Sequence, residues 1–361
     1  MRYKKKLIIL FLLILLLTAI QYTLPYYPEI VTFYDKYVFR PFQTLRNVTI
    51  GLIPLSIGDI LYIIGGVLVL VAIARWLFFL IKIRTHTHDF LTSILHSIIS
   101  LAILYVIFVL GWGGNYYKPS LTTYWDLDKR NGAYNSSLIS YDAFLIQKLN
   151  TYAPAYRSLT FRQTEKRARE YYRQYTDSRT KMYGLNVKPS IFGFFMQHLG
   201  IQGYYNPFTG EAQVNSFLPS FMLPFVITHE MAHQSGIAAE DDANLLAYVL
   251  STTTKDSSFN YSAYLNVWLY THARVRAVDT HMANTFKKQL NPITKSHLDT
   301  LRAIRRKFDS GVNDYSSFLY DEYLKLHNQK EGIETYDKVS ISAWAWERQR
   351  DSMSTKLIRL P

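Results

Sequence analysis

The first third of the chain is dominated by long runs of apolar residues. Three of them, at about residues 7–24, 59–81 and 90–112, contain almost no charged side chains. A helix rises 1.5 Å per residue, so runs of about 18–23 residues span roughly 27–35 Å, close to the hydrocarbon thickness of a bilayer. The pattern predicts three transmembrane helices and a membrane domain over residues 1–117, with the lipid bilayer as its partner.

The first run could also be a cleaved signal peptide. It lacks a clean small-x-small cleavage site, and two further apolar runs follow, so an uncleaved anchor is favoured. The distribution of basic residues then predicts the orientation. Four of the first six residues are Lys or Arg, and Lys82 and Arg84 lie in the short connection between the second and third runs. We therefore expect everything after Asn115 outside the cytoplasm, although three basic residues in the first outer loop point the other way.

That first outer loop, Pro25 to Gly58, is rich in aromatic residues and prolines. This composition is typical of an interfacial aromatic belt or a re-entrant amphipathic segment. Ordinary packing against a soluble domain explains it equally well, and the sequence leaves both interpretations open.

Residues 118–361 show the periodicity of a soluble domain that is mainly α-helical with a small β component (α+β). Apolar residues recur at helical spacing, and a polar stretch at 328–336 precedes a final helix. The clearest predicted helices are 140–150, 164–176, 261–286 and 296–308. Strand signals gather at 203–205 and 211–215, around the turn 206–210, and predict a β-hairpin. An edge strand of this hairpin could pair with an extended peptide, or the hairpin could be purely structural.

The motif that carries most chemical information is His229-Glu230-Met231-Ala232-His233, the pattern H-E-x-x-H. Residues four apart lie on the same helix face, so the two imidazoles can share one Zn²⁺. Glu230 lies beside them, where its carboxylate can take a proton from zinc-bound water. The residues around the motif predict a helix. Ser220 is expected to cap its N-terminus, Pro224 suits its first turn, and Gly236 is expected to end it.

A catalytic zinc needs a third protein ligand and one open position. The segment 238–248 predicts a second helix that begins with three acids, which suit a helix N-terminus. Glu240 is the expected third ligand, and Asn244, one turn later, is expected to accept the second N–H of a ligand histidine. Asp241 and Asp242 compete for the ligand position, or else serve as a solvated helix start.

The motif together with Glu240-Asp241-Asp242-Ala243-Asn244 resembles the zincin metallopeptidases whose third ligand is a glutamate. The resemblance implies a zincin-like soluble domain, with Glu240 on zinc and Asn244 behind a ligand. The gap from His233 to Glu240 is much shorter than in most of those enzymes. The spacing is close to that of the metzincins, but their third histidine falls on Ala239 here, which excludes that family.

Over most of its length the chain resembles an uncharacterised family of bacterial membrane-anchored proteins. The residues that carry this resemblance are the N-terminal apolar helices, the stretch Trp112 to Tyr116, the stretch Thr209 to Ala212, and the H-E-x-x-H motif continued as Gln-x-Gly. It implies a location in the bacterial cell membrane. It implies no substrate.

Composition narrows the function further. The chain has no cysteine, so disulfides and cysteine-based zinc sites are excluded. The formal net charge is +13, and a basic exterior favours anionic surfaces such as lipid headgroups or acidic polymers. No nucleic-acid recognition motif accompanies the charge, so a nucleic-acid partner is not expected.

The sequence thus predicts a membrane-bound, one-zinc hydrolase, a metallopeptidase cleaving peptides or proteins outside the cytoplasm by Glu230-assisted attack of zinc-bound water. The alternatives are a zinc amidase acting on cell-wall peptides and a non-enzymatic membrane scaffold with a vestigial metal site. A donor for the developing oxyanion is also required. Tyr204, Tyr205 and His272 are candidates for that donor, and the sequence does not rank them.

Overall fold

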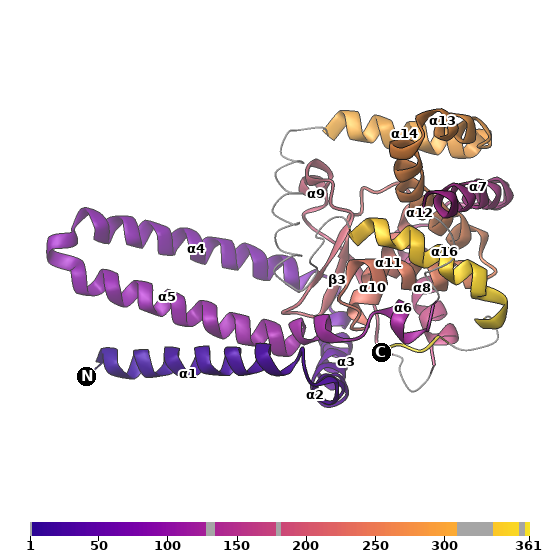
Figure 1. Ribbon diagram of the computed structural model, residues 1–361. Coiled ribbons are helices and arrows are strands. Elements are labelled where there is room, and N and C mark those ends of the chain that lie inside the picture. Colours follow the sequence, from indigo (N-terminus) through magenta and orange to yellow (C-terminus); the bar gives the residue numbers. More distant parts are fainter. Residues whose placement is uncertain (1, 128–133, 178–181, 309–334, 354–357) are drawn as a thin grey trace. The chain divides into compact units, whose positions relative to one another are not determined.

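The structure is a computed structural model that describes residues 2–127, 134–177, 182–308, 335–353 and 358–361. It is mainly helical and carries one small sheet, as predicted (Figure 1). Part of the predicted polar stretch 328–336 lies outside the described residues. The chain divides into two compact units. The first comprises Met1–Lys118 with Asn206–Glu211, and the second comprises Pro119–Tyr205 with Ala212–Pro361.

Three long apolar helices form most of the first unit: α1 (Arg2–Thr23), α4 (Ile57–Ile81) and α5 (Ile83–Gly111) (Figure 1). Each is long and apolar enough to cross a membrane, which confirms the three predicted runs. Most of their Leu, Ile and Val side chains are exposed, as expected where lipid is the solvent. The third helix begins at Ile83 and not near residue 90, because the polar stretch after Lys82 is already helical, with a kink at His86.

The connection between α1 and α4 is also helical. It contains α2 (Pro28–Tyr34), the π-helix η1 (Asp35–Phe39), α3 (Arg40–Thr49) and the short 3₁₀ helix η2 (Ile50–Leu52). A further 3₁₀ helix, η3 (Gly113–Tyr117), follows α5. Tyr26, Phe33 and Tyr37 are exposed whereas Tyr34 and Phe39 are buried, so this aromatic segment has one apolar side turned outward.

Loop 206–211 belongs to the first unit because buried polar side chains of that unit hold it. Arg46 donates from Nη1 to the Pro207 carbonyl at 2.7 Å and from Nη2 to the Gly111 carbonyl at 3.0 Å. Gln43 donates to the Gly210 carbonyl at 2.9 Å. Both side chains are almost fully buried.

Glu211 completes this arrangement at the start of α4. Its two carboxylate oxygens accept hydrogen bonds from the backbone N–H groups of Ile57, at 3.2 Å, and Gly58, at 2.5 Å. An anion at a helix N-terminus satisfies donors that the helix itself leaves open. We call Gln43, Arg46 and Glu211 the loop clamp.

The second unit is built mainly of helices packed around the central helix α12 (Ser257–Val278). Among the described residues, the other helices are α6 (Leu121–Tyr124), α7 (Tyr134–Tyr152), η4 (Ala153–Ala155), α8 (Phe161–Tyr175), α9 (Gly193–Leu199), α10 (Leu223–Gln234), α11 (Glu240–Thr253), α13 (Thr280–Lys288), α14 (Pro292–Phe308) and α16 (Thr335–Met353). The predicted helices 140–150, 164–176 and 296–308 correspond to α7, α8 and α14. The predicted helix 261–286 is wrong as one element, because Asp279 adopts an extended conformation and its side chain caps α13.

The sheet has three strands in the order β1-β3-β2, formed by β1 (Val187–Pro189), β2 (Gly203–Asn206) and β3 (Glu211–Val214). The predicted hairpin is therefore confirmed as β2 and β3. Strand β1 was not predicted; it pairs in parallel with β3, Val187 opposite Ala212. Among the described strands, β2 lies at the edge of the sheet.

Candidate metal centre

The H-E-x-x-H motif lies on α10, whose twelve residues are all buried. The helix ends as predicted: Gly236 has a φ of +89°, a left-handed conformation that glycine adopts without strain. The N–H of Ile237 then donates to the Ala232 carbonyl at 3.2 Å and closes the last turn.

The start of α10 differs from the prediction. The N-cap residue is Met222, and no side chain caps the helix. The predicted cap, Ser220, lies two residues too early, and its hydroxyl is instead within 2.9 Å of the Tyr156 hydroxyl. Pro224 does lie in the first turn, where its missing N–H is tolerated.

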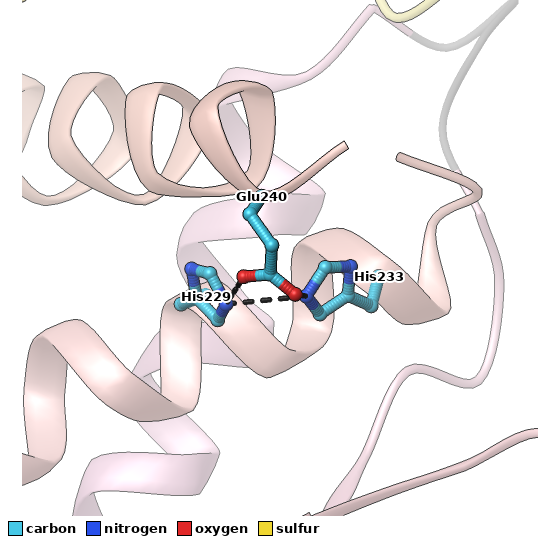
Figure 2. Close-up of side chains that lie close together, drawn as sticks. All are labelled: His229, His233 and Glu240. Atoms are coloured by element: carbon cyan, nitrogen blue, oxygen red, sulfur yellow. Dashed lines mark hydrogen bonds and ion pairs between the residues drawn. The ribbon is translucent and has the colours of Figure 1, made fainter. Parts of the chain in front are cut away.

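Three side chains from α10 and α11 converge on one point (Figure 2). Nε2 of His229 and Nε2 of His233 are 3.1 Å apart. Glu240, the first residue of α11, places one carboxylate oxygen 3.3 Å from His229 Nε2 and the other 3.4 Å from His233 Nε2. All three residues are buried. We call this set the metal cluster, because its atoms could hold one metal ion.

The donor set fits zinc. Zinc takes histidine nitrogen and carboxylate oxygen at about 2.0–2.2 Å, so two ligands of one tetrahedral ion lie about 3.3 Å apart. The separations of 3.1–3.4 Å in the metal cluster agree with that spacing. Two nitrogens and a carboxylate are also the ligands expected for a catalytic zinc that keeps a fourth position open.

The two acids beside Glu240 lie outside this cluster. The Asp242 carboxylate accepts a hydrogen bond from the Leu121 N–H at 2.9 Å and so connects α11 to α6. Asp241 is half-buried and is not part of the cluster. Of the three acids that the sequence left in competition, the structure brings only Glu240 to the histidines.

The second nitrogen of each histidine determines which nitrogen is free for a metal. His233 Nδ1 lies 2.8 Å from the Ile237 carbonyl, so a protonated Nδ1 donates there and leaves Nε2 as a ligand. His229 Nδ1 is buried and has no hydrogen-bond partner among the described residues. Burial lowers the pKa of His229, and the Glu240 carboxylate, followed more weakly by the Asn244 side chain, opposes that shift. The predicted hydrogen bond from a ligand histidine to Asn244 is not formed among the described residues, and the effect of Asn244 on the metal cluster is limited to this influence on the pKa of His229.

The electrostatics of the cluster favour an ionised carboxylate. Burial alone would raise the pKa of Glu240, but His233 and His229 hold it well below its ordinary value. Burial lowers the pKa of His233, yet the Glu240 charge outweighs this and raises it to about 9. The cluster thus keeps a negative ligand next to two imidazoles, and a cation bound there would take the place of the protons on the histidines.

Glu230 has a different environment from Glu240. Its side chain is buried, and its Oε2 has no hydrogen-bond partner among the described residues. Burial raises its pKa to about 8; His233 opposes this shift and Glu240 adds to it. A buried carboxylate with few donors is a stronger base than an exposed one, which is the property that a general base requires.

Strand β2 runs directly past Glu230. A Cβ atom added at Gly203 would collide with the Glu230 carboxylate, so only glycine lets the strand approach so closely. The Asn215 N–H donates to the Gln202 carbonyl at 2.8 Å, so Gln202 faces β3. Neighbouring residues of an antiparallel strand point their peptide groups in opposite directions. The N–H and C=O of Gly203 therefore point away from β3, toward the edge of the sheet.

The predicted oxyanion donors are not part of the metal cluster. The His272 ring stacks on Trp268, and its Nδ1 lies 3.0 Å from an Asp142 carboxylate oxygen. The Tyr204 hydroxyl is 3.5 Å from Ser190 Oγ. A residue that the sequence did not single out is Tyr270, on α12. Burial raises its pKa to about 12, and Glu240 contributes to this shift. With 29 tyrosines in the chain and no motif around Tyr270, no sequence signal distinguishes it.

Comparison with known proteins gives a family and no function. No curated protein and no solved structure matches the chain. A family model described as "Protein of unknown function (DUF3810)" matches residues 34–341, which is more than half of the chain. The match includes α10, α11 and most of the first unit. The chain is a member of the DUF3810 family.

Proposed function

We propose that this chain is a membrane-bound zinc metallopeptidase that cleaves peptide bonds outside the cytoplasm, with α10 and α11 arranged as in zincins. The observation that carries the proposal is the combination of the metal cluster with the buried base Glu230 on one helical turn. A metal site alone would suit a structural role. A carboxylate of raised pKa next to it suits hydrolysis.

The residues have separate roles in this proposal. His229, His233 and Glu240 would hold one zinc ion. When bound, zinc supplies Lewis acidity that polarises the scissile carbonyl and lowers the pKa of water. Glu230 would accept the proton of the attacking water and pass it to the leaving amine. Tyr270, whose pKa responds to the Glu240 charge, is a candidate donor to the oxyanion.

The edge of β2 supports a peptide as substrate. Its outward-facing peptide group at Gly203 lies beside the base, and this strand is partly exposed. An extended peptide can add to such an edge through main-chain hydrogen bonds, which position a scissile bond without requiring a particular side chain. This arrangement is the reason for proposing a peptidase over a hydrolase of small amides.

The decisive experiment measures metal and activity in sequence. Full-length protein purified with zinc supplementation should contain about one equivalent of zinc. Glu230→Gln should retain that zinc and lose about 10²–10⁴-fold of peptide hydrolysis in a peptide-library profile. Glu170→Gln, an exposed glutamate on α8, is the matched control and should match wild type. Less than a tenth of an equivalent of zinc would overturn any zinc-enzyme function.

The same assay identifies which kind of bond is cleaved. If isolated cell-wall peptide cross-links are cleaved in a Glu230-dependent way and library peptides are not, the protein is a cell-wall amidase. If wild type and Glu230→Gln give equal product patterns, Glu230 is not the base. For orientation, a reporter fused after Pro361 should be active only outside the cytoplasm, as the basic residues of the short connections predict.

A further inference from the structure

The positive charge of the chain beyond the membrane domain is concentrated in one segment. Residues 118–361 carry 30 Lys/Arg against 23 Asp/Glu, an excess of +7. Residues 274–308 alone hold nine of these cations and only two acids, so this segment accounts for an excess of the same size. The nine cations are Arg274, Arg276, Lys287, Lys288, Lys295, Arg302, Arg305, Arg306 and Lys307.

The structure gathers these cations on neighbouring helices, at the end of α12 and on α13 and α14. Eight of the nine are exposed, Lys287 being half-buried. Lys295, in the first turn of α14, donates to the carbonyl of Lys288, the last residue of α13, at 2.8 Å, so the two helices meet at these ends (Figure 1). Burial, then the charges of Arg302 and Arg276, lowers the pKa of Lys287. Cations from three helices are therefore close enough to repel one another. We call this surface the basic face.

Its two acids do little to neutralise it. The Asp279 carboxylate caps α13 by accepting the Met282 N–H at 2.8 Å. Asp299 forms an exposed ion pair with Arg302 at 2.6 Å. Exposed ion pairs of this kind contribute little to stability, and this one leaves most of the positive charge around it in place. Like charges held together on a folded surface are unfavourable by themselves, and an anionic partner would relieve them.

An exposed aromatic surface adjoins the end of the basic face. The Phe308 ring, at the end of α14, lies 6.2 Å from the Phe194 ring and 5.0 Å from the His198 ring of α9. Around it, four large apolar side chains are between 54% and 65% exposed: Ile191, Phe194, Phe195 and Phe217. A Cβ at Gly193 would come within 2.9 Å of the Phe217 ring, so Phe217 packs against the start of α9, the helix that carries Phe194 and Phe195. We call them the aromatic patch.

We propose that the basic face and the aromatic patch together dock onto the anionic headgroup surface of a lipid bilayer. The cations would meet lipid phosphates, and the phenylalanines would enter the boundary between headgroups and acyl chains. This combination is typical of interfacial membrane contacts. A soluble polyanion would pair with the cations but would leave the phenylalanines in water. The three apolar helices of the first unit supply the bilayer.

Helix α8 shows that basic charge alone does not make such a surface. Its exposed Arg162, Lys166, Arg169 and Arg173 also follow one face. Glu165 and Glu170 lie among them, and Glu165 pairs with Arg169 at 3.4 Å. No residue of α8 is an exposed large apolar side chain. This helix therefore offers a control in which four cations can be reversed, as on α14, with a different expected result.

The test uses full-length protein in nanodiscs, with one fluorescent label on α14. Because the chain has no cysteine, exposed Ser296→Cys gives a unique labelling site. Nitroxide lipids report contact by quenching. We expect quenching at least roughly fivefold stronger in phosphatidylcholine–phosphatidylglycerol discs than in phosphatidylcholine discs, and weaker in high salt. Charge reversal of the α14 end, R302E/R305E/R306E/K307E, should abolish the difference, whereas R162E/K166E/R169E/R173E on α8 should preserve it.

A second variant tests the aromatic patch without changing charge. Phe195→Ser should reduce quenching in the anionic discs while zinc content stays at the wild-type value. Three results would each overturn the proposal: equal quenching of wild type in both kinds of disc, equal loss in the α14 and α8 charge reversals, or binding of soluble polyphosphate without any dependence on lipid charge. The last result would assign the basic face to a soluble polyanion.

Discussion

Each of the two units buries a group of polar side chains, and the two groups use them differently. In the loop clamp, Arg46 donates from its two terminal nitrogens to backbone carbonyls and Glu211 accepts from backbone N–H groups, so the protein itself supplies the partners of these atoms. In the second unit, His229, His233 and Glu240 turn their ligand atoms toward one another. Nδ1 of His229 and Oε2 of Glu230 are buried without hydrogen-bond partners among the described residues.

The difference indicates which group needs something from outside. A buried polar atom without a partner costs about 1–3 kcal/mol, so a protein keeps several together only where another requirement outweighs that cost. Glu211 and Glu230 make the contrast concrete. Glu211, held by two N–H donors, is an architectural carboxylate. Glu230, with a pKa raised to about 8 by burial, retains the basicity that hydrolysis uses.

The strongest way to break this comparison is to remove one ligand of the metal cluster. His233→Ala should lower zinc affinity by more than about a hundredfold, since even supporting residues of zinc sites are worth 10–100-fold. Zinc content and chelator competition measure the effect. His281→Ala, an exposed histidine on α13, is the matched control and should bind zinc as wild type does. If His233→Ala binds zinc as tightly as wild type, the three side chains do not form a zinc site, and the contrast with the loop clamp is wrong.

The converse change is Arg46→Ala in the loop clamp. Arg46 is 4% exposed, and its loss leaves buried carbonyls without a donor, so we expect a destabilisation of about 2–4 kcal/mol. Thermal unfolding in detergent measures it, with exposed Arg84→Ala as control. Zinc affinity of the folded protein should stay at the wild-type value. A loss of zinc in proportion to the loss of stability would mean that the two groups are not independent.

A change at Gly203 sharpens the role of the base. Gly203→Ala introduces a Cβ into the space of the Glu230 carboxylate, so either the strand or the base must move. A displacement of about 1 Å at a catalytic group costs on the order of 10²-fold in rate. Peptide hydrolysis should fall by that order while zinc content is unchanged. Gly66→Ala in α4, where an added Cβ meets nothing within 4 Å, should leave both quantities unchanged.

The sequence predicted the elements that local patterns encode. Apolar runs gave the three long helices, turn residues gave the β2–β3 hairpin, and Gly236 gave the end of α10. Spacing on two short helices predicted Glu240 as the third ligand with Asp241 and Asp242 as competitors, and the structure brings Glu240 to His229 and His233. These features depend on contacts between residues close in sequence, which periodicity and capping describe well.

What the sequence missed depends on contacts between distant residues. Strand β1 is three residues long and is defined only by its pairing with β3, more than twenty residues away. The loop clamp joins Arg46 to Pro207, and no local sequence pattern predicts a contact between residues so far apart in the chain. The single predicted helix 261–286 failed at Asp279, whose capping hydrogen bond to Met282 competes with helix continuation. The charge of Glu240, on α11, influences Tyr270, on α12, because these two helices pack together.

The stability of the metal-free protein should depend on pH through the ionisation of Glu230. Its pKa in the folded state, about 8, lies above the ordinary 4.5, so the folded state binds more protons between these values. Stability from this group is present below about pH 4.5 and is lost as the pH rises toward 8. His233, with a pKa raised to about 9, acts in the same direction between 6.5 and 9. His229, whose pKa is lowered by burial, acts in the opposite direction below pH 6.5, so the melting temperature of metal-free wild type should fall between about pH 6.5 and pH 8.

Two variants isolate the contribution of Glu230 to that fall. Glu230→Gln cannot ionise, so its melting temperature should fall less over the same range. Glu170→Gln should follow the wild-type profile, because Glu170 is exposed. Parallel profiles for wild type and Glu230→Gln would show that Glu230 has an ordinary pKa, and would place it with Glu211 as an architectural carboxylate.

The smallest expected effect concerns the unequal support of the two histidines. His233 is oriented by the backbone carbonyl of Ile237, which no substitution removes, whereas Asn244, whose side chain opposes the lowering of the His229 pKa, can be replaced. Asn244→Ala should therefore weaken zinc binding by about tenfold, the lower end of the range for residues behind a zinc ligand. Chelator competition measures this, with exposed Asn284→Ala as control. If Asn244→Ala binds zinc as tightly as wild type, Glu240 and the buried position of α10 orient His229 without help. The metal cluster would then be held, like the loop clamp, mainly by the fold itself.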